Sequence, residues 1–162
     1  MVWFLDFEAH HIESYDCRDF GKLRYIVKEM TILSGNGKRC YNYFVRNPCK
    51  LSYMPDTETA HFQFQHMVCY GSLGTTLFES PIKDIDRKVG EDVVYVKELQ
   101  KTNFIKEYLL NVIELEGLPP LKTLNNYMNE RCEVKHGNHC ARRKVYELRH
   151  AYAKTKQLTH LL

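Results

Sequence analysis

The sequence predicts an α/β fold in which one mixed sheet, with three antiparallel strands followed by parallel strands, carries helices on its faces. The first half of the chain holds three strand-like segments, and an Asn-Gly step between the last two is a strong hairpin signal. The second half alternates short apolar segments with helical patterns, which is typical of parallel strands joined by helices. In such a sheet we expect the polar chemistry at the carboxyl end of the first strand.

The strands expected in the first half are apolar and lie between polar turns. Residues 2–7 read VWFLDF, a nearly continuous apolar run that is typical of a strand buried on both faces. Residues 23–33 and 40–45 are the next two strands, and residues 34–37 (SGNG) supply the turn between them.

The second half is divided by proline and glycine residues, which set the expected boundaries. An apolar stripe at helical spacing indicates a helix, and a short apolar run indicates a strand. The expected elements are a helix that includes 61–66 after an N-cap within 56–59, one or two helical turns within 81–92, a strand at 93–96, a helix at 97–110, a strand at 111–115, a polar helix at 121–131 and a last helix at about 139–156.

Length and composition limit the classes of function. A chain of 162 residues with 44% hydrophobic and 12% aromatic content predicts a single domain over residues 1–162 with a substantial core. A net charge of +3 and a pI near 8.5 permit contact with nucleic acid without requiring it. No apolar run approaches the roughly 18 residues of a membrane span and no signal peptide opens the chain, so we expect an intracellular protein, of the nucleus or cytoplasm, with no membrane contact. The six cysteines are then expected to be thiols or metal ligands.

Residues 132–144 (CEVKHGNHCARRK) form the densest group of potential metal ligands. Cys132, His136 and Cys140 are spaced C-x3-H-x3-C, and thiolate with imidazole at short spacing is the ligand chemistry that favours Zn²⁺. The Gly-Asn step within the stretch supplies a tight turn, and an apolar stripe at helical spacing follows. The sequence therefore predicts a structural zinc site at the N-terminus of the last helix.

A closed structural zinc site needs a fourth ligand, which must come from elsewhere in the chain. The candidates are His66, Cys69, His61 or a carboxylate, and His66 completes the predicted set. The other interpretation is an ordinary loop, in which the thiols are small buried hydrophobic groups and the imidazoles are solvated.

Asp6 and Glu8 lie two residues apart at the carboxyl end of the expected first strand, so their side chains project to the same face. Two carboxylates this close are costly unless a cation joins them. With its elements in this order, the chain resembles the ribonuclease H-like, DEDDh-type 3′ to 5′ exonucleases, whose first motif is an apolar strand ending in Asp-x-Glu. The resemblance implies that these two residues would hold two divalent ions, Mg²⁺ or Mn²⁺, that activate water and stabilise the leaving oxygen.

The other two motifs of that family lack their acidic residues here. The second motif opens a helix with Asn-x-x-x-Asp, and Lys97 and Lys101 stand in the places of the Asn and the Asp. The third motif is His-x4-Asp on the last helix, in which His139 matches and Lys144 replaces the Asp. Two of the four carboxylate ligands that the family uses are therefore missing.

Replacing two carboxylates by two ammonium groups changes the formal charge of the site from minus four to zero. A two-metal site does not survive that change, so the resemblance implies that Asp6, Glu8 and His139 are vestigial. Our hypothesis is that Lys101 and Lys144 reach the two carboxylates and replace the metals as counter-ions, giving a salt-bridged pseudo-active site. The other interpretation is that both lysines point to solvent, as most lysines do.

A degenerate exonuclease-like core with a Cys/His cluster near the last helix is similar to the Maelstrom domain of germline small-RNA silencing. The similarity is carried by Asp6-x-Glu8 and by Cys132, His136 and Cys140. It implies structural zinc and an adaptor role in an RNA-silencing-type pathway. The Maelstrom cluster includes a Glu ligand that the sequence does not locate here, and its second spacing is longer than that between His136 and Cys140.

These features favour a catalytically degenerate, exonuclease-like domain that binds nucleic acid, in particular single-stranded RNA, or that docks proteins that do. Basic residues beside aromatic ones, as in residues 142–146 (RRKVY), offer phosphate contacts and stacking faces. The expected contacts are Arg142, Arg143 and Lys97. Each basic group also has a simpler interpretation as part of a solvated face.

Two other functions stay open. Unconventional carboxylates around the strand at 93–96 could rebuild a metal site, giving an active metal-dependent 3′ to 5′ exonuclease or endoribonuclease. The candidates are Asp84, Asp86, Asp92 and Glu98, together with the carboxylates of the first strand and His139. A zinc-stapled protein-interaction domain without nucleic-acid binding is the third possibility. The sequence has no glycine-rich nucleotide loop and no Ser/His/Asp nucleophile elbow, which gives other hydrolases and dehydrogenases little support.

Overall fold

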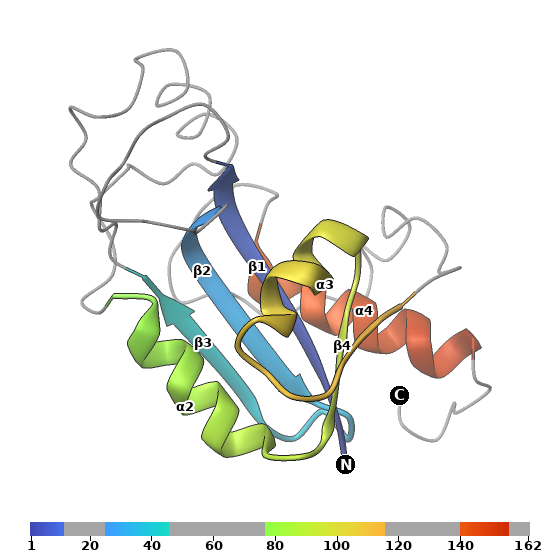
Figure 1. Cartoon of the computed structure of the whole chain (residues 1–162). Helices are drawn as coiled ribbons and strands as arrows, with labels where there is room; N and C mark the ends of the chain where they lie inside the picture. The colour runs from blue at the N-terminus through green and yellow to red at the C-terminus, as the bar shows by residue number, and fades with distance from the viewer. Residues whose placement is uncertain (12–24, 46–76, 116–139, 156–162) are drawn as a thin grey trace.

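The computed structural model describes residues 1–11, 25–45, 77–115 and 140–155 (Figure 1). The strands and helices of this part are β1 (Val2–His11), β2 (Tyr25–Ser34), β3 (Cys40–Phe44), α2 (Glu79–Val89), β4 (Val93–Val96), α3 (Leu99–Lys106), β5 (Val112–Glu114) and α4 (Ala141–Thr155). The five strands form one sheet in the order β3-β2-β1-β4-β5. β1, β2 and β3 pair antiparallel, whereas β4 runs parallel to both β1 and β5. The predicted mixed α/β sheet, antiparallel in its first half and parallel in its second, is confirmed.

β1 is the central strand, and its side chains alternate between the two faces of the sheet. Trp3, Leu5 and Phe7 pack with residues of α2 and α3. On the opposite face, the ring of Phe4 contacts Tyr152 of α4, with ring centroids 5.2 Å apart. Figure 1 shows α2 and α3 on one side of the sheet and α4 on the other. Helices therefore cover both faces, as the sequence predicts.

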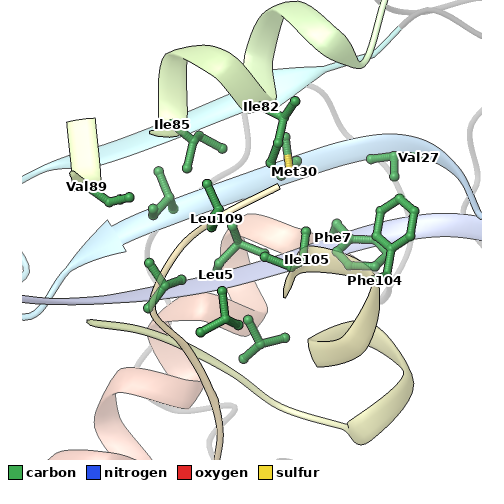
Figure 2. Close-up of a cluster of buried hydrophobic side chains, with 14 of the residues drawn as sticks. Leu5, Phe7, Val27, Met30, Ile82, Ile85, Val89, Phe104, Ile105 and Leu109 are labelled. Carbon is green, nitrogen blue, oxygen red and sulfur yellow. The ribbon is translucent and has the colours of Figure 1, made fainter. Parts of the chain in front are cut away.

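The face beneath α2 and α3 carries a large cluster of buried apolar side chains (Figure 2). Ile82, Ile85 and Val89 repeat at i, i+3 and i+7, which places them on one side of α2. Phe104 and Ile105 of α3 enter the same cluster. Fully burying one such side chain contributes about 1.5–3 kcal/mol, so this face supplies much of the stability.

α2 is longer than predicted. The sequence predicts one or two helical turns within 81–92, whereas the helix has 11 residues. Pro81 does not interrupt it because Pro81 lies in the first turn, where the missing N–H costs no intrahelical bond. The helix ends at Gly90, whose φ of 54° suits glycine.

β1 is also longer than predicted, and this changes where its carboxylates lie. The sequence predicts that the strand ends near Asp6, but β1 continues beyond this residue because it remains paired with β2. Its parallel partner β4, by contrast, ends at the pair Leu5–Val96. Asp6 and Glu8 therefore lie within β1, just beyond the point at which β4 stops.

α3 is shorter than the predicted 97–110. It begins at Leu99 because Glu98, the residue before it, has a φ of 74° that no helix accommodates. The other strands of the sheet agree with their predicted ranges to within two residues.

The apolar stripe predicted for the last helix consists of Ala141, Val145, Leu148 and Tyr152. In α4 the first three are almost completely buried and Tyr152 is half-buried. The helices predicted around 61–66 and at 121–131 lie outside the described residues. Within the part of the chain that the structure describes, no helix is both long enough and apolar enough to cross a membrane.

Candidate functional site

Two buried carboxylates define the site. Asp6 and Glu8 project from β1 on the face that α4 covers, and each residue is 6% exposed. β4 ends beside them, and the chain turns into α3 through Glu98, whose positive φ is uncommon for a residue with a side chain. The first turn of α3 therefore lies next to the carboxylates.

Lys101, in that first turn, pairs with the first carboxylate. Its Nζ lies 2.8 Å from Asp6 Oδ1 and donates a second hydrogen bond, also of 2.8 Å, to the carbonyl oxygen of Phe7. Burial favours the neutral amine, but the carboxylates of Asp6 and Glu8 outweigh this effect and raise the pKa of Lys101 above its ordinary value. Lys101 is therefore a fixed positive charge.

Lys144, in the first turn of α4, pairs with the second carboxylate. Its Nζ lies 2.5 Å from Glu8 Oε1. Burial, and then the neighbouring Asp6, raise the pKa of Glu8, against the lowering effect of Lys144 and Lys101. The ammonium groups thus offset a desolvation cost that would otherwise favour a protonated Glu8.

The predicted counter-ion pairs are present. Lys101 and Lys144 do not point to solvent, since each places its ammonium group against a buried carboxylate. Two ammonium groups and two carboxylates give a formal charge of zero. A buried pair of this kind is stable while both partners remain, but removal of one leaves an uncompensated buried charge.

Glu147 is a third carboxylate of this region that the sequence did not single out. It is 7% exposed, and Arg143 Nε lies 3.5 Å from its Oε1. Burial raises the pKa of Glu147, while Arg143 and Lys144 oppose that shift and Asp6 adds to it. Its spacing of i+3 from Lys144 is a sequence signal, because the two residues share a helix face.

Glu29 of β2 is a second residue that the sequence did not single out. It stands directly opposite Glu8 across the antiparallel pair and is 3% exposed. Glu29 Oε1 accepts hydrogen bonds from Cys140 Sγ at 3.5 Å and from the backbone N–H of Arg142 at 3.2 Å. A carboxylate at a helix N-terminus is stabilised by the unpaired N–H groups and the helix dipole. α4 therefore neutralises both opposed carboxylates, Glu29 with its backbone and Glu8 with Lys144.

A small cavity of about 60 Å³ opens beside the ion pairs. We call it the lysine pocket, and it is lined by Asp6, Lys97, Glu98, Lys101, Lys144 and Leu148. Lys97, which stands in the place of the family's Asn, thus lies at the pocket with both counter-ion lysines. Arg142 and Arg143, the other predicted nucleic-acid contacts, are half-buried in the first turn of α4.

The carboxylates considered for a rebuilt metal site are mostly elsewhere. Asp84 and Asp86 lie on α2, which packs against the opposite face of the sheet. Asp92 precedes β4 and accepts a hydrogen bond of 3.0 Å from Trp3 Nε1, at the amino end of these parallel strands. Of the four candidates, Glu98 alone lines the lysine pocket.

The predicted zinc ligands are mostly outside the described residues. Cys132, His136 and His66 lie there, as does His139, whereas Cys140 is buried beside Glu29. Within the described ranges, no group of three or more His, Cys, Asp or Glu side chains is placed to hold a metal. The zinc site therefore remains a prediction.

The fold is similar to that of a solved 3′-exonuclease. The crystal structure of a full-length 3′-exonuclease superimposes with a TM-score of 0.54 at 11% sequence identity, covering 96% of this chain and 81% of that one. No protein-family model matches the sequence. No curated protein matches it either. At this identity the likeness concerns the fold, and the chain therefore has an exonuclease-like fold.

Proposed function

We propose that the protein is a catalytically degenerate, exonuclease-like domain that binds nucleic acid, with single-stranded RNA as its ligand. The observation that carries this proposal is the pair of lysine–carboxylate contacts, Lys101 with Asp6 and Lys144 with Glu8, inside a fold similar to that of a 3′-exonuclease. Both lysines stand where the resemblance to DEDDh exonucleases requires a metal-binding carboxylate.

The ion pairs argue against two-metal catalysis on electrostatic grounds. Two divalent ions need several carboxylate oxygens free to coordinate them. Here an ammonium group already occupies one oxygen of each carboxylate, and a second cation placed within a few ångströms of it would be strongly repelled in a buried site. The ion pairs then keep the shape of a nuclease site without its metal ions.

Nucleic-acid binding rests on the cations around this site. Arg142 and Arg143 lie in the first turn of α4, as does Lys144 of the ion pairs, and Lys97 lines the lysine pocket. Cationic side chains near a groove bind phosphates and release counter-ions, whatever the base sequence. A role as adaptor in an RNA-silencing-type pathway, similar to that of the Maelstrom domain, is part of this proposal.

The test combines binding and cleavage on the same single-stranded RNA. We expect binding that weakens with rising salt and no cleavage with Mg²⁺ or Mn²⁺. Cleavage that depends on Mn²⁺ and is lost in Asp6→Asn would establish the active nuclease instead. Absence of any salt-dependent binding would favour the protein-interaction domain.

We also propose that the chain holds a structural zinc ion, with Glu29 in place of His66 as the fourth ligand beside Cys132, His136 and Cys140. Glu29 Oε1 lies 3.5 Å from Cys140 Sγ, and zinc binding would replace this hydrogen bond because the thiol loses its proton when it becomes a ligand. Oxygen and sulfur ligands of one tetrahedral zinc ion are about 3.5 Å apart, given Zn–O of about 2.0 Å and Zn–S of about 2.3 Å. The Maelstrom cluster also contains a Glu, which supports the same assignment.

Elemental analysis of purified protein tests the zinc proposal. We expect about one zinc per chain and loss of most of it in Glu29→Gln, because the amide is a poor zinc ligand. The control is Glu147→Gln, another buried carboxylate, which should keep its zinc. If both variants keep the zinc, Glu29 is not a ligand.

A further inference from the structure

We propose that the lysine pocket holds one ribonucleotide unit of single-stranded RNA without a divalent metal, with a phosphate on Lys97 and the sugar 2′-hydroxyl on Asp6. The inference rests on the proposed binding of nucleic acid and adds the chemistry that recognises the ligand. In this proposal the lysine pocket binds RNA specifically and does not cleave it. The resemblance to nucleases, in contrast, implies metal-dependent cleavage.

Lys97 is the cation of the pocket that is available to a ligand. The ammonium groups of Lys101 and Lys144 are already held by Asp6 and Glu8. Lys97 is half-buried and has no carboxylate partner within the described residues. An unpaired ammonium group at a pocket binds an anionic oxygen, and phosphate is the anion that nucleic acid supplies.

Asp6 supplies the second half of the recognition. Its Oδ1 pairs with Lys101, whereas its Oδ2 is buried and receives no hydrogen bond from the described residues. A buried carboxylate oxygen without a donor is costly, so a ligand that brings a donor gains that energy. A phosphate oxygen cannot donate, but a sugar hydroxyl can. The ligand therefore needs a hydroxyl close to a phosphate, which is the arrangement in RNA and not in the interior of DNA.

The size and walls of the pocket fit this assignment. A volume of about 60 Å³ is room for a few water molecules, so the pocket takes a hydroxyl or a phosphate edge and leaves the base outside. Much of the wall is formed by lysine side chains, whose four-carbon stems adjust easily as a hydroxyl enters.

The experiment measures fluorescence anisotropy of one single-stranded sequence made as RNA, as DNA and as 2′-O-methyl RNA, all in EDTA. The proteins are the wild type, Lys97→Met, Asp6→Ala and, as a matched control, Lys83→Met, which removes an exposed lysine of α2. Circular dichroism establishes that each variant is folded.

Two separate effects are expected. The wild type binds RNA about tenfold more tightly than DNA or 2′-O-methyl RNA, and Asp6→Ala reduces this preference to about threefold or less. Lys97→Met weakens the binding of both RNA and DNA about fivefold, and it lowers the slope of log affinity against log salt concentration by about 0.7. Lys83→Met changes neither the affinity nor the slope.

Other outcomes overturn the inference in distinguishable ways. Equal affinity for RNA, DNA and 2′-O-methyl RNA would show that Asp6 does not bind the 2′-hydroxyl. This comparison uses the wild type alone, so it does not depend on the folding of any variant. Equal effects of Lys97→Met and Lys83→Met on the affinity and its salt dependence would show that Lys97 does not bind the phosphate. In both cases binding itself remains and the proposed function stands, whereas failure of every oligonucleotide to bind overturns both.

Discussion

The two faces of β1 use the same backbone for opposite purposes. Toward α2 and α3 the strand presents Trp3, Leu5 and Phe7, which join a cluster of apolar side chains. Toward α4 it presents Asp6 and Glu8, which are just as well buried but are charged and held by lysines. The loss of a contact on an apolar face costs stability in proportion to the volume lost, whereas the loss of a partner on a buried charged face is costly when the remaining charge cannot reach water. The following predictions test that contrast.

The largest effect is expected from Lys101→Met. This change leaves the Asp6 carboxylate buried without its counter-ion, which costs about 3–5 kcal/mol in the free energy of unfolding. Urea denaturation measures it, with Lys106→Met, an exposed lysine of the same helix, as control. Adding Asp6→Asn to Lys101→Met should restore most of the loss. If Lys101→Met and Lys106→Met cost the same, the ion pair does not stabilise the fold.

The apolar face should respond nearly as strongly to the loss of volume. Leu5 is fully buried, so Leu5→Ala is expected to cost about 3 kcal/mol through lost transfer energy and the cavity that remains. The same change at Leu110, which is 72% exposed, should cost less than about 0.5 kcal/mol. No second substitution should rescue Leu5→Ala in the way that Asp6→Asn rescues Lys101→Met, and finding one would remove the contrast between the faces.

Lys28 of β2 sharpens the comparison because it is a buried lysine whose positive charge is disfavoured by burial. It is 3% exposed, and its Nζ donates to the carbonyl oxygen of Val45 at 3.0 Å. Burial lowers the pKa of Lys28 from 10.5 to about 8. Between these values the unfolded chain keeps a proton that the folded chain has lost, so stability rises with pH, by at most about 1.4 kcal/mol per pH unit.

This pH dependence is measured as the difference in the free energy of unfolding between the wild type and Lys28→Met. Denaturation from pH 7 to 10.5 should show wild-type stability rising relative to the variant above pH 8 and running parallel to it below pH 8, where the lysine is charged in both states. A constant difference across the whole range would show that the folded lysine titrates near its ordinary pKa.

The smallest effect is expected from Glu8→Gln. Since the pKa of Glu8 is raised by burial, the folded state favours the neutral form, and ionisation lowers stability as pH rises above the ordinary value. Glutamine removes that cost, and Lys144, whose side chain is 29% exposed, can still reach water. We expect a change of less than about 1 kcal/mol at pH 7, smaller than that of Lys144→Met. A larger loss of stability in Glu8→Gln than in Lys144→Met would contradict this prediction, because it would show that the Glu8 charge stabilises the fold more than that of Lys144 does.

The apolar face was predictable from sequence because alternation along a strand and a 3.6-residue repeat along a helix are local patterns. The partners of Lys101 and Lys144 were also predictable, but through motif spacing in a resembled family and not through local pattern. Glu29 and Glu147 were missed because their importance depends on strand register and on how α4 docks, and neither property is local. The length of α2 was misjudged because Pro81 indicates a boundary unless its place in the first turn is known.

The early end of β4 also bears on how the molecule avoids association. Past the pair Leu5–Val96, no described strand continues the parallel ladder along β1. Lys101 donates to the Phe7 carbonyl on this stretch and sets a positive charge against it. A charged side chain beside strand backbone is a common protection against strand addition, so we expect the lysine that neutralises Asp6 to disfavour the addition of another strand here as well.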